Sequence, residues 1–135
     1  LMEFIRKKYI CKNQIKKGIS GVKDVMTYFK SNHSIALMVD QRVSEGEKIS
    51  FFGYEAYTTT LPAQLALRFQ CEIVPIYISR NNSNDFEMEF FEPIKPLAKG
   101  SQDEKNSISK KINKVVEQMV LRDPSQWILT HNRWK

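Results

Sequence analysis

The chain has 135 residues, of which 41% are hydrophobic and 27% are charged. This length fits one modest domain and is too short for two large independent cores. The composition excludes a disordered tail and a collagen-like chain. The longest unbroken aliphatic stretch is the five residues Ile35–Val39, so no segment of the sequence is long enough to span a bilayer. The chain opens on Leu1 without a signal peptide, and we interpret it as a piece of a longer protein.

The net charge of +6 is concentrated at the N-terminus. Residues 1–30 carry eight Lys and Arg against two acids, whereas residues 31–135 carry thirteen of each sign. A localised basic patch attracts anions such as nucleic acid, anionic lipid head groups or a phosphorylated substrate. A solvated helix face explains the same lysines equally well, so charge alone leaves both interpretations open.

Two helices are predicted early in the chain, over residues 2–10 and 21–30. Ser20 is expected to cap the second, whose apolar residues follow helical spacing. Residues 35–39 form a continuous apolar run typical of a strand buried on both faces. After a polar stretch, threonines and a proline predict the start of a helix over 62–70.

The rest of the chain is predicted to hold a second buried strand over 72–79, a turn at 81–84 and a half-exposed strand over 86–91. A capping box at 101–104 opens a long amphipathic helix that stops at Asp123 before a proline. Alternation of strands with crossover helices predicts an α/β fold. We expect a mixed, mostly parallel sheet flanked by helices, with the opening strand and helix lying upstream of this chain.

Asp40, Gln41 and Arg42 form the most suggestive polar cluster. Asp40 follows the predicted strand 35–39, and ligands bind at the carboxyl ends of strands in open α/β sheets. The cluster is therefore a candidate substrate site. In the alternative interpretation, Asp40 caps a loop and pairs with Arg42.

Pro75 is unusual because it falls inside an apolar run that is predicted to be a strand. Proline removes a ladder hydrogen bond, so it belongs at a sheet edge or a bulge. Bulges often flank functional sites, whereas a plain edge strand carries no functional meaning. The sequence does not separate these two interpretations.

No complete catalytic group is visible in the sequence. Cys11 and Cys71 belong to no CxxC pair and are expected to be reduced thiols that fill the core. His33 and His131 have no ligand-spaced neighbours, so we expect no zinc site, and no carboxylate follows His33 five residues later. Glycine-rich phosphate loops and GxSxG are absent from the sequence, and we expect no cofactor.

The C-terminus carries Trp127, His131, Arg133 and Trp134. Tryptophan beside basic residues is typical of a membrane–water interface. Alternatively, the two tryptophans close the hydrophobic core, which is the commoner role.

A series of short motifs follows in a fixed order along the chain. They are Lys17-Gly18, Met38-Val-Asp-Gln41, Gly46, Phe51-Phe-Gly53 with Glu55-Ala56 and Thr58, Ala63 to Phe69 with Cys71, Val74-Pro-Ile76, Asn113, Glu117, Pro124-Ser-Gln-Trp127 and His131-Asn-Arg-Trp-Lys135. Their order and spacing over about residues 15–135 resemble the bacterial lipid A biosynthesis acyltransferases, the late lauroyl/myristoyl transferases. The chain departs from the family pattern at Ser125, where an acid is frequent, and at Leu129, where Trp is frequent.

The resemblance implies an α/β acyltransferase core behind an N-terminal membrane helix, on the cytoplasmic face of the inner membrane. It implies transfer of a fatty acyl chain from an acyl carrier protein thioester to a hydroxyl of a phosphorylated lipid A precursor. In the family, the catalytic histidine belongs to an H-x4-[D/E] motif that lies upstream together with the membrane helix. Residues 1–135 contain neither and resemble the C-terminal portion of one acyltransferase domain. We therefore expect this chain alone to be inactive.

The resemblance also singles out candidate site residues. The substrate-binding candidates are Lys17, Asp40, Gln41, Arg42 and Arg80, and the structural candidates beside the site are Gly53 and Pro75. The N-terminal basic patch gains inner-membrane lipid, the precursor's phosphates and the acidic carrier protein as possible partners.

Two rival interpretations remain. A nucleic-acid-binding module fits the pI of about 9.3, but the chain lacks an RNP-like aromatic motif, zinc spacing and a recognisable helix-turn-helix, so we expect no nucleic-acid partner. A non-catalytic membrane-surface protein with the same α/β fold is the other alternative.

Overall fold

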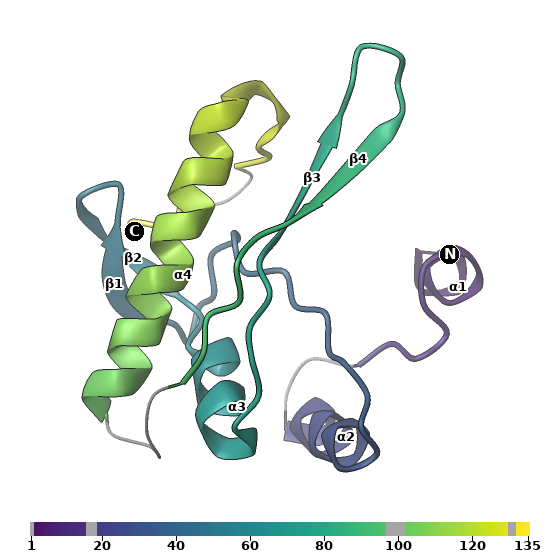
Figure 1. Cartoon of the computed structure of the whole chain (residues 1–135), viewed down its shortest axis with the longest axis vertical. Coiled ribbons are helices and arrows are strands. Elements are labelled where there is room, and N and C mark those ends of the chain that lie inside the picture. The colour runs from purple at the N-terminus through teal and green to yellow at the C-terminus, as the bar shows by residue number, and fades with distance from the viewer. Residues whose placement is uncertain (1, 16–18, 97–101, 130–131) are drawn as a thin grey trace. The chain divides into compact units, whose positions relative to one another are not determined.

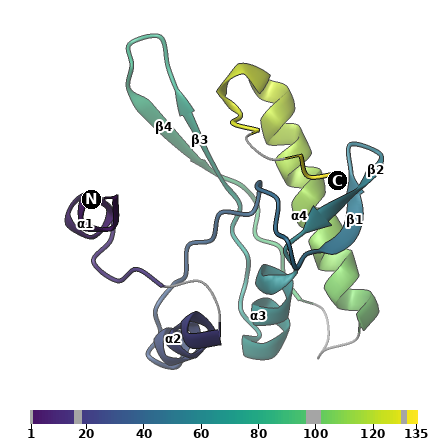
Figure 2. The same cartoon turned by 180° about the vertical axis from the view of Figure 1, so that it is seen from behind.

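The computed structural model describes residues 2–15, 19–96, 102–129 and 132–135. The chain divides into two units, Leu1–Leu37 and Met38–Lys135. Figures 1 and 2 show the elements of both units from opposite sides. Lys17, Gly18, His131 and the first residue of the capping box at 101–104 lie outside the described residues, so the structure does not test the roles expected of them.

The first unit contains the two predicted helices, α1 (Met2–Tyr9) and α2 (Ile19–Lys30). The prediction that Ser20 caps α2 is wrong, because the helix already begins at Ile19. Asn32, with φ of 57°, follows the end of α2 in the left-handed conformation that often terminates a helix. The basic side chains of α1 are exposed, and Lys7 pairs with Glu3 one turn away at 3.0 Å.

In the second unit, β1 (Glu47–Phe51) and β2 (Tyr54–Thr58) form an antiparallel hairpin. Its two turn residues, Phe52 and Gly53, have φ of 52° and 79°. Positive φ at both turn positions matches the right-handed twist of a tight hairpin. The alternating residues of the hairpin, including Phe51, are buried. Neither β1 nor β2 was predicted from the sequence.

Two helices complete the core of this unit: α3 (Leu61–Phe69) and α4 (Gln102–Arg122). Both confirm their predictions, and a short 3-10 helix, Pro124–Gln126, follows where α4 was expected to stop. Helix α4 packs against β1 and α3. The core consists of Phe51, Ala56, Ala63, Leu67, Ile108, Ile112, Val116 and Val120. Burying each large apolar side chain contributes about 1.5–3 kcal/mol, so this cluster holds the hairpin to the helices.

The second sheet is also a two-stranded antiparallel hairpin, made by β3 (Ile76–Arg80) and β4 (Phe86–Phe90). The hairpin itself was predicted, with its turn at the expected place. The expectation of a mostly parallel sheet is wrong, because both sheets in the described part of the chain are antiparallel pairs. The α/β class holds, because helices and strands share one unit.

The prediction that residues 72–79 form a strand buried on both faces is also wrong. Only residues from Ile76 onward belong to β3, and their side chains alternate in exposure. On one face, Arg122 stacks over Tyr77 and binds Glu89 at 2.6 Å. The other face carries apolar side chains that are 44–67% exposed: Ile76, Ile78, Phe86, Met88 and Phe90.

Residues 35–39 do not form the predicted strand. No strand in the described residues pairs with this run, and a strand needs a neighbour to satisfy its backbone groups. The run is not buried on both faces, because the side chain of Met38 is 84% exposed.

Pro75 lies where the hydrogen-bonded pairing of the β3–β4 hairpin is interrupted. The β3–β4 pairing ends at Ile76 opposite Phe90, and an isolated bridge then joins Ile73 to Ile94. Between these two pairs, the segment that follows β4 has one more residue than the segment that precedes β3. This difference is typical of a β-bulge. The Pro75 carbonyl accepts a hydrogen bond from Phe91 N–H at 3.0 Å.

Candidate functional site

Arg133 is fully buried at the centre of the second unit. Its guanidinium donates to the Asp40 carbonyl at 3.0 Å and to the Thr58 hydroxyl at 3.2 Å. The same group lies 4.0 Å from the centre of the Phe51 ring, in a cation–π arrangement. Burial lowers the pKa of Arg133, and the nearby charge of Asp40 opposes this shift.

Asn113 of α4 joins the same buried network. Its side-chain NH₂ donates to the Ser50 carbonyl at 2.9 Å and to the Thr58 hydroxyl at 3.1 Å. Its carbonyl oxygen accepts from Arg133 at 3.4 Å. The network therefore ties together the hairpin β1–β2, helix α4 and the C-terminal segment. A buried polar network of this kind favours one arrangement of a core.

The structure places two of the candidate residues beside Arg133. The Gln41 side chain donates to the Asp40 carboxylate at 2.9 Å and to the Ile128 carbonyl at 3.0 Å. The alternative pairing of Asp40 with Arg42 is not found among the described ion pairs. Arg42 is exposed and lies over the Tyr57 ring, 5.6 Å from its centre.

The turn of the β1–β2 hairpin is held from two sides. The carboxylate of Glu117 accepts from Phe52 N–H at 2.6 Å, and the indole N–H of Trp134 donates to the Phe51 carbonyl at 3.3 Å. Trp127 and Trp134 both pack against the core cluster, which confirms the interpretation that they close the core. These contacts leave the backbone of the turn little freedom to move.

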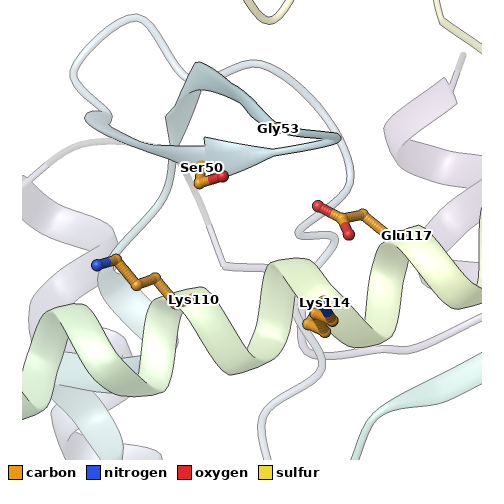
Figure 3. A pocket seen from close by; sticks show the side chains of 5 residues that line it. All are labelled: Ser50, Gly53, Lys110, Lys114 and Glu117. Carbon is orange, nitrogen blue, oxygen red and sulfur yellow. The ribbon is translucent and has the colours of Figure 1, made fainter.

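A pocket of about 320 Å³ lies between this hairpin and α4. It is lined by Ser50, Gly53, Lys110, Lys114 and Glu117. Figure 3 shows the Glu117 carboxylate pointing toward the hairpin, with Lys110 at the opposite end of the row along α4. Gly53 lines this pocket, and its place beside a substrate site stays a prediction.

The remaining candidates lie elsewhere. Arg80 is the last residue of β3, and its guanidinium lies over the Phe86 ring. The Gln126 side chain accepts from Arg80 N–H at 2.7 Å and donates to the Arg80 carbonyl at 3.1 Å. Pro75 belongs to the same hairpin. Neither residue lines the pocket, so the structure does not gather the four described substrate candidates, Asp40, Gln41, Arg42 and Arg80, into one cluster.

The comparison with protein families gives one match. The family model described as bacterial lipid A biosynthesis acyltransferase matches residues 6–135. The chain belongs to this family. A comparison with curated proteins found no match.

Many of the motif residues of this acyltransferase chain gather at the β1–β2 hairpin. They are Phe51, Gly53, Thr58, Asn113, Glu117, Trp127, Arg133 and Trp134. Gly46 joins them because a Cβ there would lie 2.8 Å from the backbone N and O of Thr58, so only glycine fits without a shift. The lysines of the pocket were not predicted, although their i, i+4 spacing on a helix with an opposite apolar face was a readable signal.

The other polar groups of the acyltransferase chain offer little chemistry. Cys11 is exposed, so the prediction that it fills the core is wrong, whereas Cys71 is half-buried and burial raises the pKa of its thiol. Within the described ranges, no three or more His, Cys, Asp or Glu side chains group together as a metal site would require. None of the described helices has the length and apolar character needed to cross a bilayer.

Proposed function

We propose that the protein containing this chain transfers a fatty acyl group from an acyl carrier protein thioester to a hydroxyl of a phosphorylated lipid A precursor. The single observation that supports this is the family match over residues 6–135. The catalytic H-x4-[D/E] motif is proposed to lie upstream of Leu1. The reaction is proposed to take place at the cytoplasmic face of the inner membrane, with the anchor outside this chain.

The chemistry of the proposed reaction is a simple acyl transfer. The upstream histidine accepts the proton of the acceptor hydroxyl, and the hydroxyl oxygen bonds to the thioester carbonyl carbon. The carbonyl oxygen becomes an oxyanion that needs hydrogen-bond donors. The carbon–sulfur bond then breaks, the carrier's thiol leaves with a proton, and an ester remains on the precursor.

The residues of this chain are proposed to bind and orient the acceptor. The β1–β2 hairpin is a rigid support because Asn113, Glu117 and Trp134 hold its backbone and Arg133 donates to the Thr58 hydroxyl. A rigid support matters because transfer requires the hydroxyl within a narrow range of positions relative to the thioester.

The purified 135-residue chain is expected to show no acyl transfer. It would be incubated with an acyl carrier protein thioester and a bisphosphorylated lipid A precursor, and the products would be followed by mass spectrometry. The expected result is no acylated precursor, because the general base lies outside the chain. Turnover above the rate without protein would contradict the proposal that the catalytic motif lies upstream.

A further inference from the structure

The pocket between the hairpin and α4 is lined by one glycine and four residues with polar or charged side chains. Its five residues are a serine, a glycine, two lysines and a glutamate, with no apolar side chain among them. Its volume of about 320 Å³ is near the small end for ligand pockets, which span roughly 300–1,000 Å³. The lining and the size favour a compact polar group over a hydrocarbon chain.

The charge of the pocket is unbalanced in favour of an anion. Lys105, one helical turn before this stretch, is paired with Glu47 of the hairpin. Lys110 and Lys114 line the pocket, and neither belongs to an ion pair within the part of the chain that the structure describes. Two ammonium groups spaced i, i+4 on one helix face repel each other, and a bound anion relieves that repulsion.

The carboxylate of Glu117 does not serve as the anion that relieves the repulsion between the two lysines. Its carboxylate is committed to Phe52 N–H at 2.6 Å, at the turn of the hairpin. Figure 3 shows Lys110 and Glu117 at opposite ends of the row of side chains, with the Ser50 side chain facing α4 from the hairpin. The Ser50 hydroxyl adds a hydrogen-bond donor on the wall opposite the lysines.

The backbone of the hairpin beside the pocket is held before any ligand enters, whereas the side chains of Ser50, Lys110 and Lys114 are exposed. The Ser50 carbonyl accepts from Asn113, and the turn is held by Glu117. A pre-organised site loses less entropy on binding than a flexible one. A flat array of surface lysines on a mobile loop would not have this property.

We propose that this pocket binds a phosphate monoester on the sugar headgroup of the acceptor, with Lys110 and Lys114 contacting the phosphate oxygens and the Ser50 hydroxyl donating to one of them. The ammonium groups supply charge and the hydroxyl supplies a direction. This inference rests on the proposed function for the identity of the acceptor.

The test measures binding of small probes to the 135-residue chain. The probes are glucosamine 1-phosphate, glucosamine and inorganic phosphate, followed by ¹H–¹⁵N NMR titration. Glucosamine 1-phosphate is expected to shift the amide signals of Ser50, Gly53 and Lys114 and to bind more tightly than either fragment. Equal binding of inorganic phosphate would mean that the sugar is not recognised, and it would overturn the headgroup assignment.

Substitutions in α4 identify the contacts. The double variant Lys110→Ala/Lys114→Ala is expected to bind glucosamine 1-phosphate about tenfold more weakly, as the loss of two exposed charged contacts predicts. The matched control Lys111→Ala removes the same charge from an exposed position on the same helix that does not line the pocket, and it is expected to change the affinity less than about twofold. Equal weakening by the control would show a diffuse charge effect and overturn the site.

The variant Glu117→Gln is expected to raise the affinity for glucosamine 1-phosphate, whereas the lysine double variant lowers it. Glutamine keeps an oxygen that accepts from Phe52 N–H but removes the negative charge. Glucosamine 1-phosphate is therefore expected to bind about two- to threefold more tightly. Unchanged circular dichroism and melting temperature confirm that each variant is folded. Weaker binding by a folded Glu117→Gln would contradict an anion in this pocket.

Kinetics of the full-length protein separate the two proposals. If it transfers acyl groups and the lysine double variant raises KM for the precursor about tenfold with little change in kcat, both proposals stand. A wild-type KM in that variant would overturn the pocket assignment and leave the function intact. If the full-length protein performs no transfer while lysine-dependent binding of the sugar phosphate persists, the function fails and the anion site stands. Lysine-dependent binding of acyl carrier protein instead of the sugar phosphate would overturn the assignment.

Discussion

Replacing Arg133 with alanine is expected to lower the free energy of unfolding by about 3–5 kcal/mol. The guanidinium is fully buried and donates to Asp40, Thr58 and Asn113. Alanine leaves the Asp40 carbonyl and the Asn113 carbonyl oxygen without this donor, whereas the Thr58 hydroxyl still accepts from Asn113. It also removes the group that covers the Phe51 ring. Urea denaturation followed by tryptophan fluorescence measures the change, because both tryptophans border this core.

Arg122→Ala is the matched control for this result. Arg122 also pairs with a carboxylate, Glu89, but both side chains are about half exposed. Exposed ion pairs contribute about 0–1 kcal/mol, so this variant is expected to unfold near the wild-type urea concentration. If Arg133→Ala were no less stable than Arg122→Ala, the buried network would not hold the unit together.

Phe51→Ala is expected to destabilise the chain by about 3–5 kcal/mol through a different mechanism. The Phe51 ring is 0% exposed and contacts Trp127 and Trp134, with ring centres 6.0 and 5.9 Å away. Alanine leaves a cavity between the hairpin and α4 and removes the aromatic contacts. The midpoint of urea denaturation and the near-ultraviolet circular dichroism of the tryptophans both report this loss.

Phe86→Ala supplies the comparison. This ring has the same chemistry but is 67% exposed on β4, so its removal is expected to cost less than about 1 kcal/mol. A Phe51→Ala variant as stable as Phe86→Ala would show that the hairpin does not form its core with α4. It would also remove the basis for a pre-organised pocket beneath the turn.

The helices could be predicted from the sequence because their evidence is local. The helix over 62–70 and the long helix that ends at Arg122 each repeat apolar residues at a spacing of three and four, and each has a clear start or stop signal. Leu65, Ile108 and Ile112 belong to these apolar repeats and are buried.

The strands were predicted less well because pairing is not local. Residues 35–39 have the composition of a buried strand but no partner in the described part of the chain. Strand β2 was missed because the hairpin turn uses Phe52 at positive φ, where turn signals favour Asn, Asp or Gly. Glu72 to Pro75 were assigned to a strand that begins at Ile76.

In the candidate site, too, local features could be predicted from the sequence, whereas contacts between distant residues could not. Asp40 and Gln41 were predicted as polar groups at the end of a strand over 35–39. The structure has no strand there and places both residues in a half-buried position. Their partner Arg133 lies 93 residues away in the sequence, so no local pattern connects them. The pocket lysines were readable only as an exposed stripe on a helix, which is typical of a solvated face.

The most direct test of the central claim is to read the coding sequence upstream of Leu1 in the same frame. We expect a hydrophobic segment of about 20 residues followed by an H-x4-[D/E] motif, as a membrane-anchored acyltransferase requires. That result would make this chain the downstream portion of a working enzyme. A stop codon directly upstream, or an unrelated domain without the motif, would contradict the proposed acyl transfer.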